Sequence, residues 1–251
     1  MNSWFLLDSG KCDAAFNMAL DEALLENVLR LGKPVLRFYG WTEPAATFGY
    51  FQKFSEVERA TLLRPVIRRP TGGGIVPHDA DWTYGFVVPP NHEWHSLAAI
   101  ESYRRIHEWI QAAFTKLKIE TELAPSCKKS IQMNRSRGDE THSEKISQRL
   151  LMSSPTNQCF SGHEKFDLLW HGKKIAGAAQ RRNKSGLLIQ GSVQPPSVTL
   201  ARADWEDAML AVARGKFSAV WNEFLPDEKL RAQAEKLARE KFSWAAHNSK
   251  R

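Results

Sequence analysis

The stretch "RRPTGGGIVPH", residues 68–78, places three consecutive glycines between an arginine pair and a histidine. Three glycines in an apolar region cost backbone entropy, and some property of the loop has to offset that cost. The residues before and after the glycines both have the pattern of a strand. This pattern excludes a P-loop and a dinucleotide fingerprint, because in both of those the glycines open a helix.

Glycines without a Cβ allow a ligand to lie against bare backbone, where N–H groups can donate to an oxygen. Arg68 and Arg69 alternate faces if the strand continues, so one of them can point toward the same site. The alternative interpretation is a tight hairpin turn with solvated arginines. The glycines alone do not separate these two hypotheses.

The composition allows one large domain or two small ones, and we expect a single domain that spans residues 1–251. The chain is 42% hydrophobic and 25% charged, which suffices for one large domain with its own core. No apolar run reaches the length of a membrane span, and no signal peptide is recognisable. The three cysteines lie far apart and form no C-x-x-C pair, which is typical of a reducing compartment. We therefore expect a cytoplasmic protein that does not bind membranes.

The net charge of +7 makes nucleic acid and an acidic carrier protein the candidate partners, with a solvated basic surface as the plain alternative. No nucleic-acid-binding motif is present, and the nine tryptophans do not alternate with basic residues as they do in a base-stacking platform. Nucleic acid is therefore the less favoured partner.

The periodicity predicts an α+β fold, with a mixed, largely antiparallel sheet and flanking helices. Residues 13–32 have the pattern of an amphipathic helix with an Asp13 N-cap and a Gly32 stop, and residues 96–117 form the clearest helical stripe. The expected strands cover residues 3–10, 34–41, 45–52, 65–71, 82–90, 166–182 and 186–194, with a hairpin turn at His171-Gly172.

Two further segments complete the expected organisation. Residues 126–158 are polar, charged and aperiodic, which predicts a long mobile loop. Residues 200–243 are expected to form C-terminal helices.

The stretch "GKKIAGAAQRR", residues 172–182, is a second candidate site. On a regular strand Lys174, Ala176, Ala178 and Gln180 share one face, so that a lysine stands at the end of a row of small residues. Such a groove suits a long apolar chain that ends in a carbonyl or carboxyl group. An exposed lysine on a thin strand is the alternative.

Cys159 follows the polar segment and has several lysines close in sequence, which could lower its thiol pKa and make it a nucleophile. A buried and inert cysteine is the commoner case. The histidines show no spacing that would make a metal site, so no metal is expected.

Taken together, the ordered motifs resemble the catalytic domain of the biotin/lipoate protein ligase family, on its lipoate side. The resemblance covers about residues 10–194. It rests on "NMALDEALL", "RRPTGGGIVPHDADWTYGFVVP", "ESYRRIHEWIQAAFTKLKIETELA" and "CF…KFDLLWHGKKIAGAAQRR…GLLIQGS", in this order.

The resemblance implies a mixed sheet with flanking helices and the transfer of an octanoyl or lipoyl group to a lysine of a carrier domain. It implies an acyl pocket lined by the glycine segment and by the small residues after Lys174, with the lysine itself at the acyl carbonyl or acyl-adenylate. The implied acyl-binding residues are Arg69, Gly72, Gly73, Gly74, His78, Ala176, Gly177 and Ala178. Expected partners are acyl carrier protein and lipoyl-domain proteins, such as H protein and E2 subunits.

"NQCF" at residues 157–160 resembles the cysteine-type octanoyltransferases and amidotransferases. By this resemblance Cys159 carries an acyl thioester, Lys174 and glycine-loop N–H groups stabilise the oxyanion, and no cofactor is tightly bound. The alternative is an ATP-dependent lipoate-protein ligase, which would use ATP-Mg. Gln190 stands where many relatives have a histidine, which leaves the acyl donor open. A basic protein that binds an acyl group or nucleic acid without turnover is the non-enzyme alternative.

Overall fold

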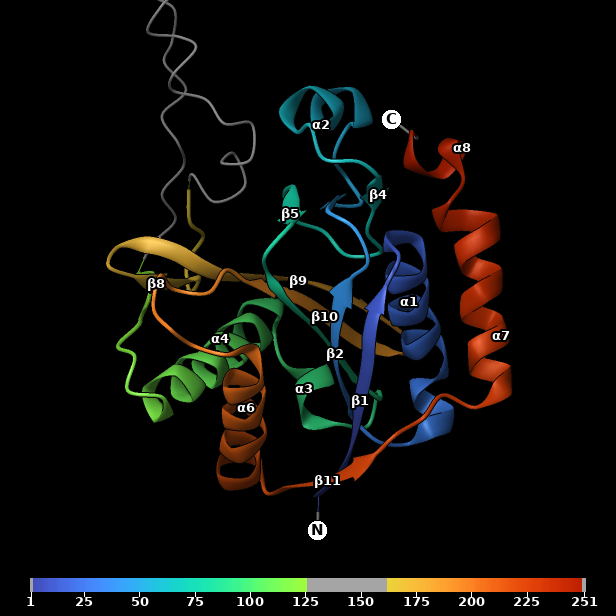
Figure 1. Ribbon diagram of the computed structural model, residues 1–251. Helices are drawn as coiled ribbons and strands as arrows, with labels where there is room; N and C mark the ends of the chain where they lie inside the picture. Colours follow the sequence, from blue (N-terminus) through green and yellow to red (C-terminus); the bar gives the residue numbers. More distant parts are fainter. Residues whose placement is uncertain (1, 126–161, 250–251) are drawn as a thin grey trace, which may run out of the picture.

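A large twisted sheet forms the centre of the molecule. This computed structural model describes residues 2–125 and 162–249, and within them eight strands pair in the order β11–β1–β2–β6–β10–β9–β8–β7 (Figure 1). Their bounds are β1 Asn2–Cys12, β2 Val35–Trp41, β6 Trp82–Val88, β7 Glu122–Leu123, β8 Leu168–Trp170, β9 Lys173–Asn183, β10 Gly186–Val193 and β11 Ala219–Glu223. The β11–β1 and β1–β2 pairs are parallel and the other pairs are antiparallel, so the predicted mixed, largely antiparallel sheet is confirmed.

Helices cover both faces of this sheet (Figure 1). One face packs against α3 (Glu93–Ser96), α4 (Ala99–Lys116) and α6 (Arg202–Phe217), and the other packs against α1 (Ala14–Leu31) and α7 (Glu228–Leu237). Alternate residues of β10 enter the two cores, with Leu187 and Ile189 on the α4 side and Leu188 on the α1 side. This double coverage explains why the central strands β6 and β10 are buried along their whole length.

A smaller sheet lies at one end of the large one, near the top of Figure 1. Within the described residues its order is β4–β3–β5, formed by β4 (Val66–Arg68), β3 (Ala45–Phe48) and β5 (Val76–His78). Two short helices, α2 (Phe54–Ala60) and α8 (Ala245–Asn248), lie beside it, and a π-helical turn at Ala238–Phe242 leads from α7 toward α8. Because β4 and β5 flank the three glycines, this small sheet carries the glycine segment.

The predicted start and end of the first helix are confirmed. The Asp13 side chain accepts from the Phe16 N–H at the start of α1, and Gly32 ends that helix in the left-handed region at φ 68°. The hairpin between β8 and β9 turns at His171-Gly172, as expected.

Two elements differ from the sequence analysis. The C-terminal segment is not only helical, because β11 lies between α6 and α7 and pairs in parallel with β1. The strand expected over residues 45–52 ends at Phe48, and a turn over residues 49–53 leads from β3 to helix α2. The loop predicted at 126–158 lies outside the described residues. Over the described ranges, no helix combines the length and the hydropathy that a bilayer span requires.

Candidate functional site

The glycine segment forms a loop that lies directly on backbone. A Cβ on Gly49 would stand 2.0 Å from the Gly73 carbonyl oxygen, so only glycine allows the two segments to approach this closely. Gly73 itself has φ +86°, and a Cβ there would lie 3.5 Å from the Cβ of Ala179 on β9. The loop therefore lies between the end of β3 and β9, with Gly73 and Gly74 exposed.

Arg69 shapes this loop from inside. Its Nη2 donates to the carbonyl oxygens of Gly72 (2.7 Å) and Gly74 (2.8 Å), and its Nη1 donates to Thr47 Oγ1 (3.0 Å). The side chain is buried. The arginine therefore holds the loop through the carbonyl groups of Gly72 and Gly74.

Arg68 points to the other side, toward the C-terminal segment. It donates to the carbonyl oxygens of Tyr50, Gln52, His247 and Asn248. The amide oxygen of Asn248 in turn accepts the Arg68 backbone N–H at 2.8 Å. Arg68 thus joins α8 to the loop that follows Gly49, on which the glycine segment rests.

His78 belongs to a buried hydrogen-bonded array under the loop. Its Nδ1 lies 2.9 Å from Asp81 Oδ2, its Nε2 lies 2.8 Å from Thr47 Oγ1, and its ring stacks on Trp41 at 3.8 Å between centroids. Since a carboxylate only accepts, Nδ1 carries the proton that it shares with Asp81. The order of groups resembles a catalytic triad, but Thr47 is fully buried and accepts from Arg69. The array therefore braces the loop.

A second brace connects the loop to α1. Gln190 of β10 accepts from Thr71 Oγ1 (2.7 Å) and donates to Asp21 Oδ2 (2.7 Å). Asp21 also forms a 2.6 Å ion pair with Arg37, and both side chains are buried. Arg37 further donates to the backbone and side chain of Asn17. The loop is thus fixed through Gln190 to the "NMALDE" turn of α1.

Lys174 does not share a face with Ala176 and Ala178, which corrects the strand prediction. A bulge at Ile175 shifts the register, since Leu168 pairs with Ala176 while Leu169 pairs with Lys174. The alternation is therefore broken between Lys174 and Ala176. Ala176 and Ala178 pack toward the core on the α4 side, whereas Lys174 turns to the opposite face.

The side chain of Lys174 lies against Gly177. A Cβ on Gly177 would lie 2.7 Å from Lys174 Cε and 2.9 Å from Nζ. Glycine at this position therefore leaves the room that the lysine side chain occupies. Ala179 follows on the same face and contacts the glycine loop. The ammonium group and the loop are two residues apart along one strand face, about 7 Å.

Asp167 completes this region, and the sequence analysis missed it. Its Oδ2 lies 2.7 Å from Lys174 Nζ and 2.7 Å from the Glu164 nitrogen, and its Oδ1 accepts from the Tyr103 hydroxyl. Its side chain is fully buried. The predicted hairpin at His171-Gly172 already brings the residue before β8 beside Gly177. The pairing register of this hairpin could therefore have identified Asp167 as a neighbour of the site.

His107 lies one helical turn beyond Tyr103, and the two rings are 4.4 Å apart. Its Nδ1 donates to the Tyr103 carbonyl oxygen at 2.9 Å. Burial lowers the pKa of His107 to about 4, with a further lowering from Lys174 that Asp167 opposes. The imidazole is therefore neutral at pH 7. The sequence analysis did not single out His107.

The structure thus gathers the predicted residues Gly72, Gly73, Gly74, Gly177 and Lys174 on one side of β9, with Arg69 and His78 beneath the loop. Ala179, Asp167, Gln190, Tyr103 and Thr71 were not predicted as site residues and contribute to it. Cys159 lies outside the described residues.

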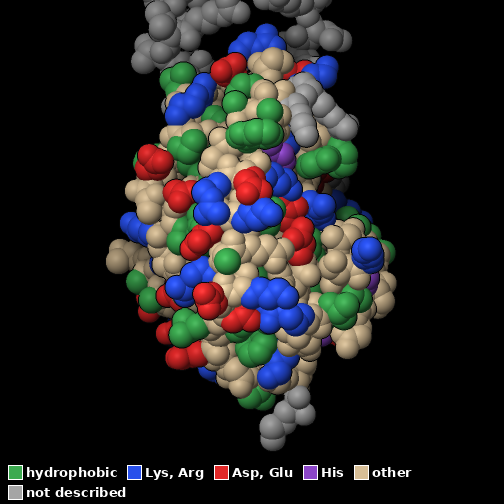
Figure 2. Space-filling view, turned by 90° about the vertical axis from the view of Figure 1, so that its right-hand side faces the viewer, with side chains coloured by type: hydrophobic (Ala, Val, Ile, Leu, Met, Phe, Trp, Pro, Cys, Tyr) green, Lys and Arg blue, Asp and Glu red, His purple; other side chains and the backbone are tan. Residues whose placement is uncertain are grey.

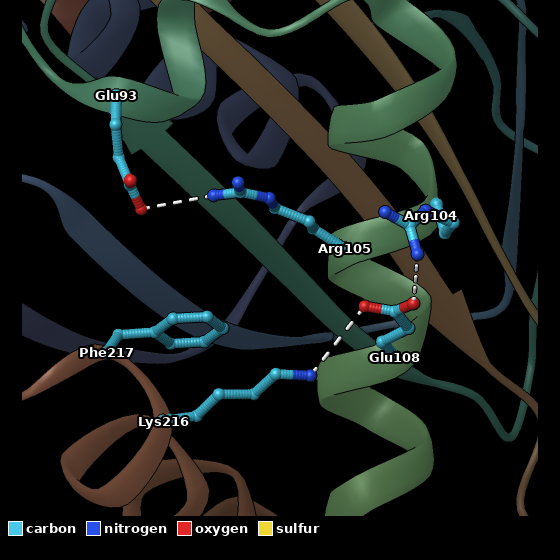
Figure 3. Close-up of a pocket in the computed structure, with 6 residues that line it drawn as sticks. All are labelled: Glu93, Arg104, Arg105, Glu108, Lys216 and Phe217. Atoms are coloured by element: carbon cyan, nitrogen blue, oxygen red, sulfur yellow. Dashed lines mark hydrogen bonds and ion pairs between the residues drawn. The ribbon is translucent and has the colours of Figure 1, made fainter.

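Glu93, Arg104, Arg105, Glu108, Lys216 and Phe217 line a pocket of about 300 Å³ on the α3, α4 and α6 side (Figure 3). Its charged side chains pair with one another: Arg105 with Glu93 at 3.1 Å, and Glu108 with both Arg104 at 2.8 Å and Lys216 at 3.7 Å. It contains none of the residues around the glycine loop. Among residues 2–125 and 162–249, no three His, Cys, Asp or Glu side chains lie close enough to hold a metal ion.

Known proteins resemble this chain along most of its length. The model of the lipoyl protein ligase A/B catalytic domain matches residues 13–195. A protein of Geobacillus kaustophilus named octanoyltransferase LipM is 37% identical over 196 residues, which cover 76% of this chain and 64% of that protein. The protein of the same name from Bacillus subtilis is 35% identical over 198 residues, covering 76% of this chain and 65% of the relative. The match thus spans just under two thirds of the length of these relatives.

Solved structures share the fold. Protein Ta0514 from T. acidophilum, solved with bound lipoic acid, superposes with a TM-score of 0.74 at 20% identity, over 99% of both chains. A lipoate-protein ligase A bound with ATP gives a TM-score of 0.70 at 20% identity, again over 99% of both chains.

Proposed function

Because the chain belongs to the lipoyl protein ligase A/B catalytic-domain family, we propose that it is an acyltransferase that moves an octanoyl or lipoyl group to a lysine of a lipoyl-carrier domain. The names of the LipM relatives support the octanoyl group. The observation that carries the proposal is the placement of Lys174 over Gly177, on the strand face that also contacts the glycine loop. A narrow strip of small residues with an ammonium group at its end suits an acyl chain with its carbonyl at the lysine.

The proposed reaction has two steps. The Cys159 thiolate attacks the carbonyl carbon of an acyl thioester donor, the carbon–sulfur bond to the donor breaks, and the donor leaves as a thiolate. The amine of the target lysine then attacks the Cys159 acyl thioester, an amide forms, and the cysteine thiol is restored with a proton from the amine. In both steps Lys174 stabilises the negative oxygen of the tetrahedral intermediate.

An ATP-dependent lipoate-protein ligase is the second candidate, because proteins with such names share the fold. A ligase would have to hold the phosphates of ATP-Mg. In this chain the guanidinium groups of Arg68 and Arg69 donate to carbonyl oxygens of the protein, so both cations are engaged within the fold and are not directed at a phosphate. The transferase needs no phosphate site, and this observation favours it.

The proposed partners are an octanoyl-loaded acyl carrier protein as donor and lipoyl-domain proteins, such as H protein and E2 subunits, as acceptors. The net charge of +7 supports an acidic partner. On the side of α1 and α7, however, basic side chains are interspersed with acidic ones (Figure 2), as in the Lys241–Glu22 and Arg30–Asp227 pairs. This side is therefore not proposed as the docking side.

The test is intact mass after incubation with octanoyl-acyl carrier protein without ATP. The chain should gain one octanoyl group, and Cys159→Ala should abolish both this adduct and transfer to a lipoyl domain. Cys12→Ala is the matched control, because burial raises the pKa of the Cys12 thiol and so makes it a weaker nucleophile. Full transfer by Cys159→Ala would refute the cysteine mechanism. Transfer that requires both ATP and free lipoate would instead identify a ligase.

A further inference from the structure

Three donors from three parts of the chain converge on the Asp167 carboxylate. Lys174 and the Glu164 N–H share Oδ2, while Oδ1 accepts from the Tyr103 hydroxyl. The carboxylate is fully buried and lies beside β9, one residue before β8 begins. A buried carboxylate is oriented by the donors that it has, because no solvent can replace one that is lost.

The two sides of this carboxylate belong to different layers of the fold. Lys174 reaches it from the face of the glycine loop, and Tyr103 reaches it from α4 on the opposite face. Without the hydroxyl, Oδ1 has no donor among these three and the carboxylate can rotate about its last bond. The ammonium group of Lys174 would move with the carboxylate, because it is bonded to Oδ2.

We propose that Tyr103 is a positioning residue, which fixes the Asp167 carboxylate and through it the Lys174 ammonium at the acyl carbonyl. This inference rests on the proposed function for its catalytic consequence, but the placement of Lys174 can be measured without any acyl group. Tyr103 touches neither the glycine loop nor Lys174 in the contacts described. Its hydroxyl bonds to Asp167 and to the Ala178 backbone of β9, and of these two it is Asp167 that bonds the Lys174 ammonium.

Burial, followed by the neighbouring carboxylate, raises the pKa of Tyr103 well above its ordinary value. The hydroxyl therefore stays protonated and remains a donor to Asp167 over the whole working range of pH. His107 holds the same helical turn through its bond to the Tyr103 carbonyl, and as a neutral group it adds no competing positive charge beside Lys174.

The test compares Tyr103→Phe with Tyr84→Phe. Tyr84 is a fully buried tyrosine on the α4 side, and its hydroxyl has no hydrogen-bond partner within the described residues. In octanoyl transfer, Tyr103→Phe should lower kcat about ten- to a hundredfold, as expected for a bond to a charged group, and leave the KM for the acyl donor within about twofold. Tyr84→Phe should change neither.

The second measurement is competitive labelling of Lys174 with an amine reagent, followed by mass spectrometry. Tyr103→Phe should raise the Lys174 labelling rate severalfold relative to the wild type and to Tyr84→Phe, at an unchanged melting temperature. Unchanged labelling would overturn the inference, as would an unchanged kcat in an active enzyme. If the wild type transfers no octanoyl group, the proposed function fails, and the labelling result alone decides whether Tyr103 positions the lysine.

Discussion

His107 should make the stability of the protein depend on pH. Its side chain is fully buried in α4, and burial lowers its pKa to about 4, whereas in the unfolded chain the group titrates near 6.5. As the pH falls below about 6.5, the unfolded chain takes up a proton that the folded chain refuses. The free energy of unfolding therefore falls as the pH drops from 7 toward 4, and this contribution is constant below 4.

The size of the effect follows from the two pKa values. Between pH 7 and pH 5, His107 should lower the free energy of unfolding by about 2 kcal/mol. The assay is urea unfolding at both pH values for the wild type and for His107→Leu, which keeps the buried volume and removes the titrating ring. The loss of stability from pH 7 to pH 5 should be about 2 kcal/mol smaller in the variant.

His171→Asn is the matched control for this experiment. His171 is exposed at the β8–β9 turn with φ 48°, a conformation that asparagine accepts, so the variant should keep the pH dependence of the wild type. Equal pH dependence in His107→Leu and the wild type would refute the reasoning. An NMR titration in which the His107 imidazole protonates near pH 6.5 in the folded protein would refute it as well.

Glycine and carboxylate positions around the site give three further predictions. Gly177→Ala should displace Lys174 from its seat and lower octanoyl transfer about tenfold or more, with little change in the melting temperature, because only the end of a flexible side chain has to move. Gly49→Ala should cost about 3 kcal/mol in urea unfolding, since its Cβ meets loop backbone, whereas Gly72→Ala points into open space and should stay within about 0.5 kcal/mol. Asp21→Ala leaves a buried arginine without its carboxylate and should cost about 3–5 kcal/mol by the same measurement; a loss under about 1 kcal/mol would contradict this account.

Much of the fold could be predicted from local patterns. The α1 caps at Asp13 and Gly32, the α4 stripe and the β8–β9 turn all depend on residues close in sequence, and all are confirmed. The strand β11 was missed because its pairing partner β1 lies more than two hundred residues away. Only tertiary pairing stabilises such a short segment as a strand.

The site likewise contains some residues that local sequence predicts and others that depend on contacts between distant parts of the chain. The glycine loop and Lys174 stand out in the sequence because their residue types are unusual where they occur. The bulge at Ile175 leaves no mark in a row of small residues, so regular alternation put Lys174 on the wrong face. The contacts of Asp167 with Tyr103 and of Gln190 with Asp21 join distant parts of the chain, and side-chain type alone does not reveal such partners.

The bonds of Arg68 have a consequence for protein synthesis. Its backbone N–H and side chain bind Asn248, which lies 180 residues further along the chain. In the same way, β1 can pair with β11 only after that later strand has been synthesised. During translation the glycine loop is made well before the segment that fixes its support, because 180 residues separate Arg68 from Asn248. The glycine loop therefore lacks its full support until Asn248 has also been synthesised.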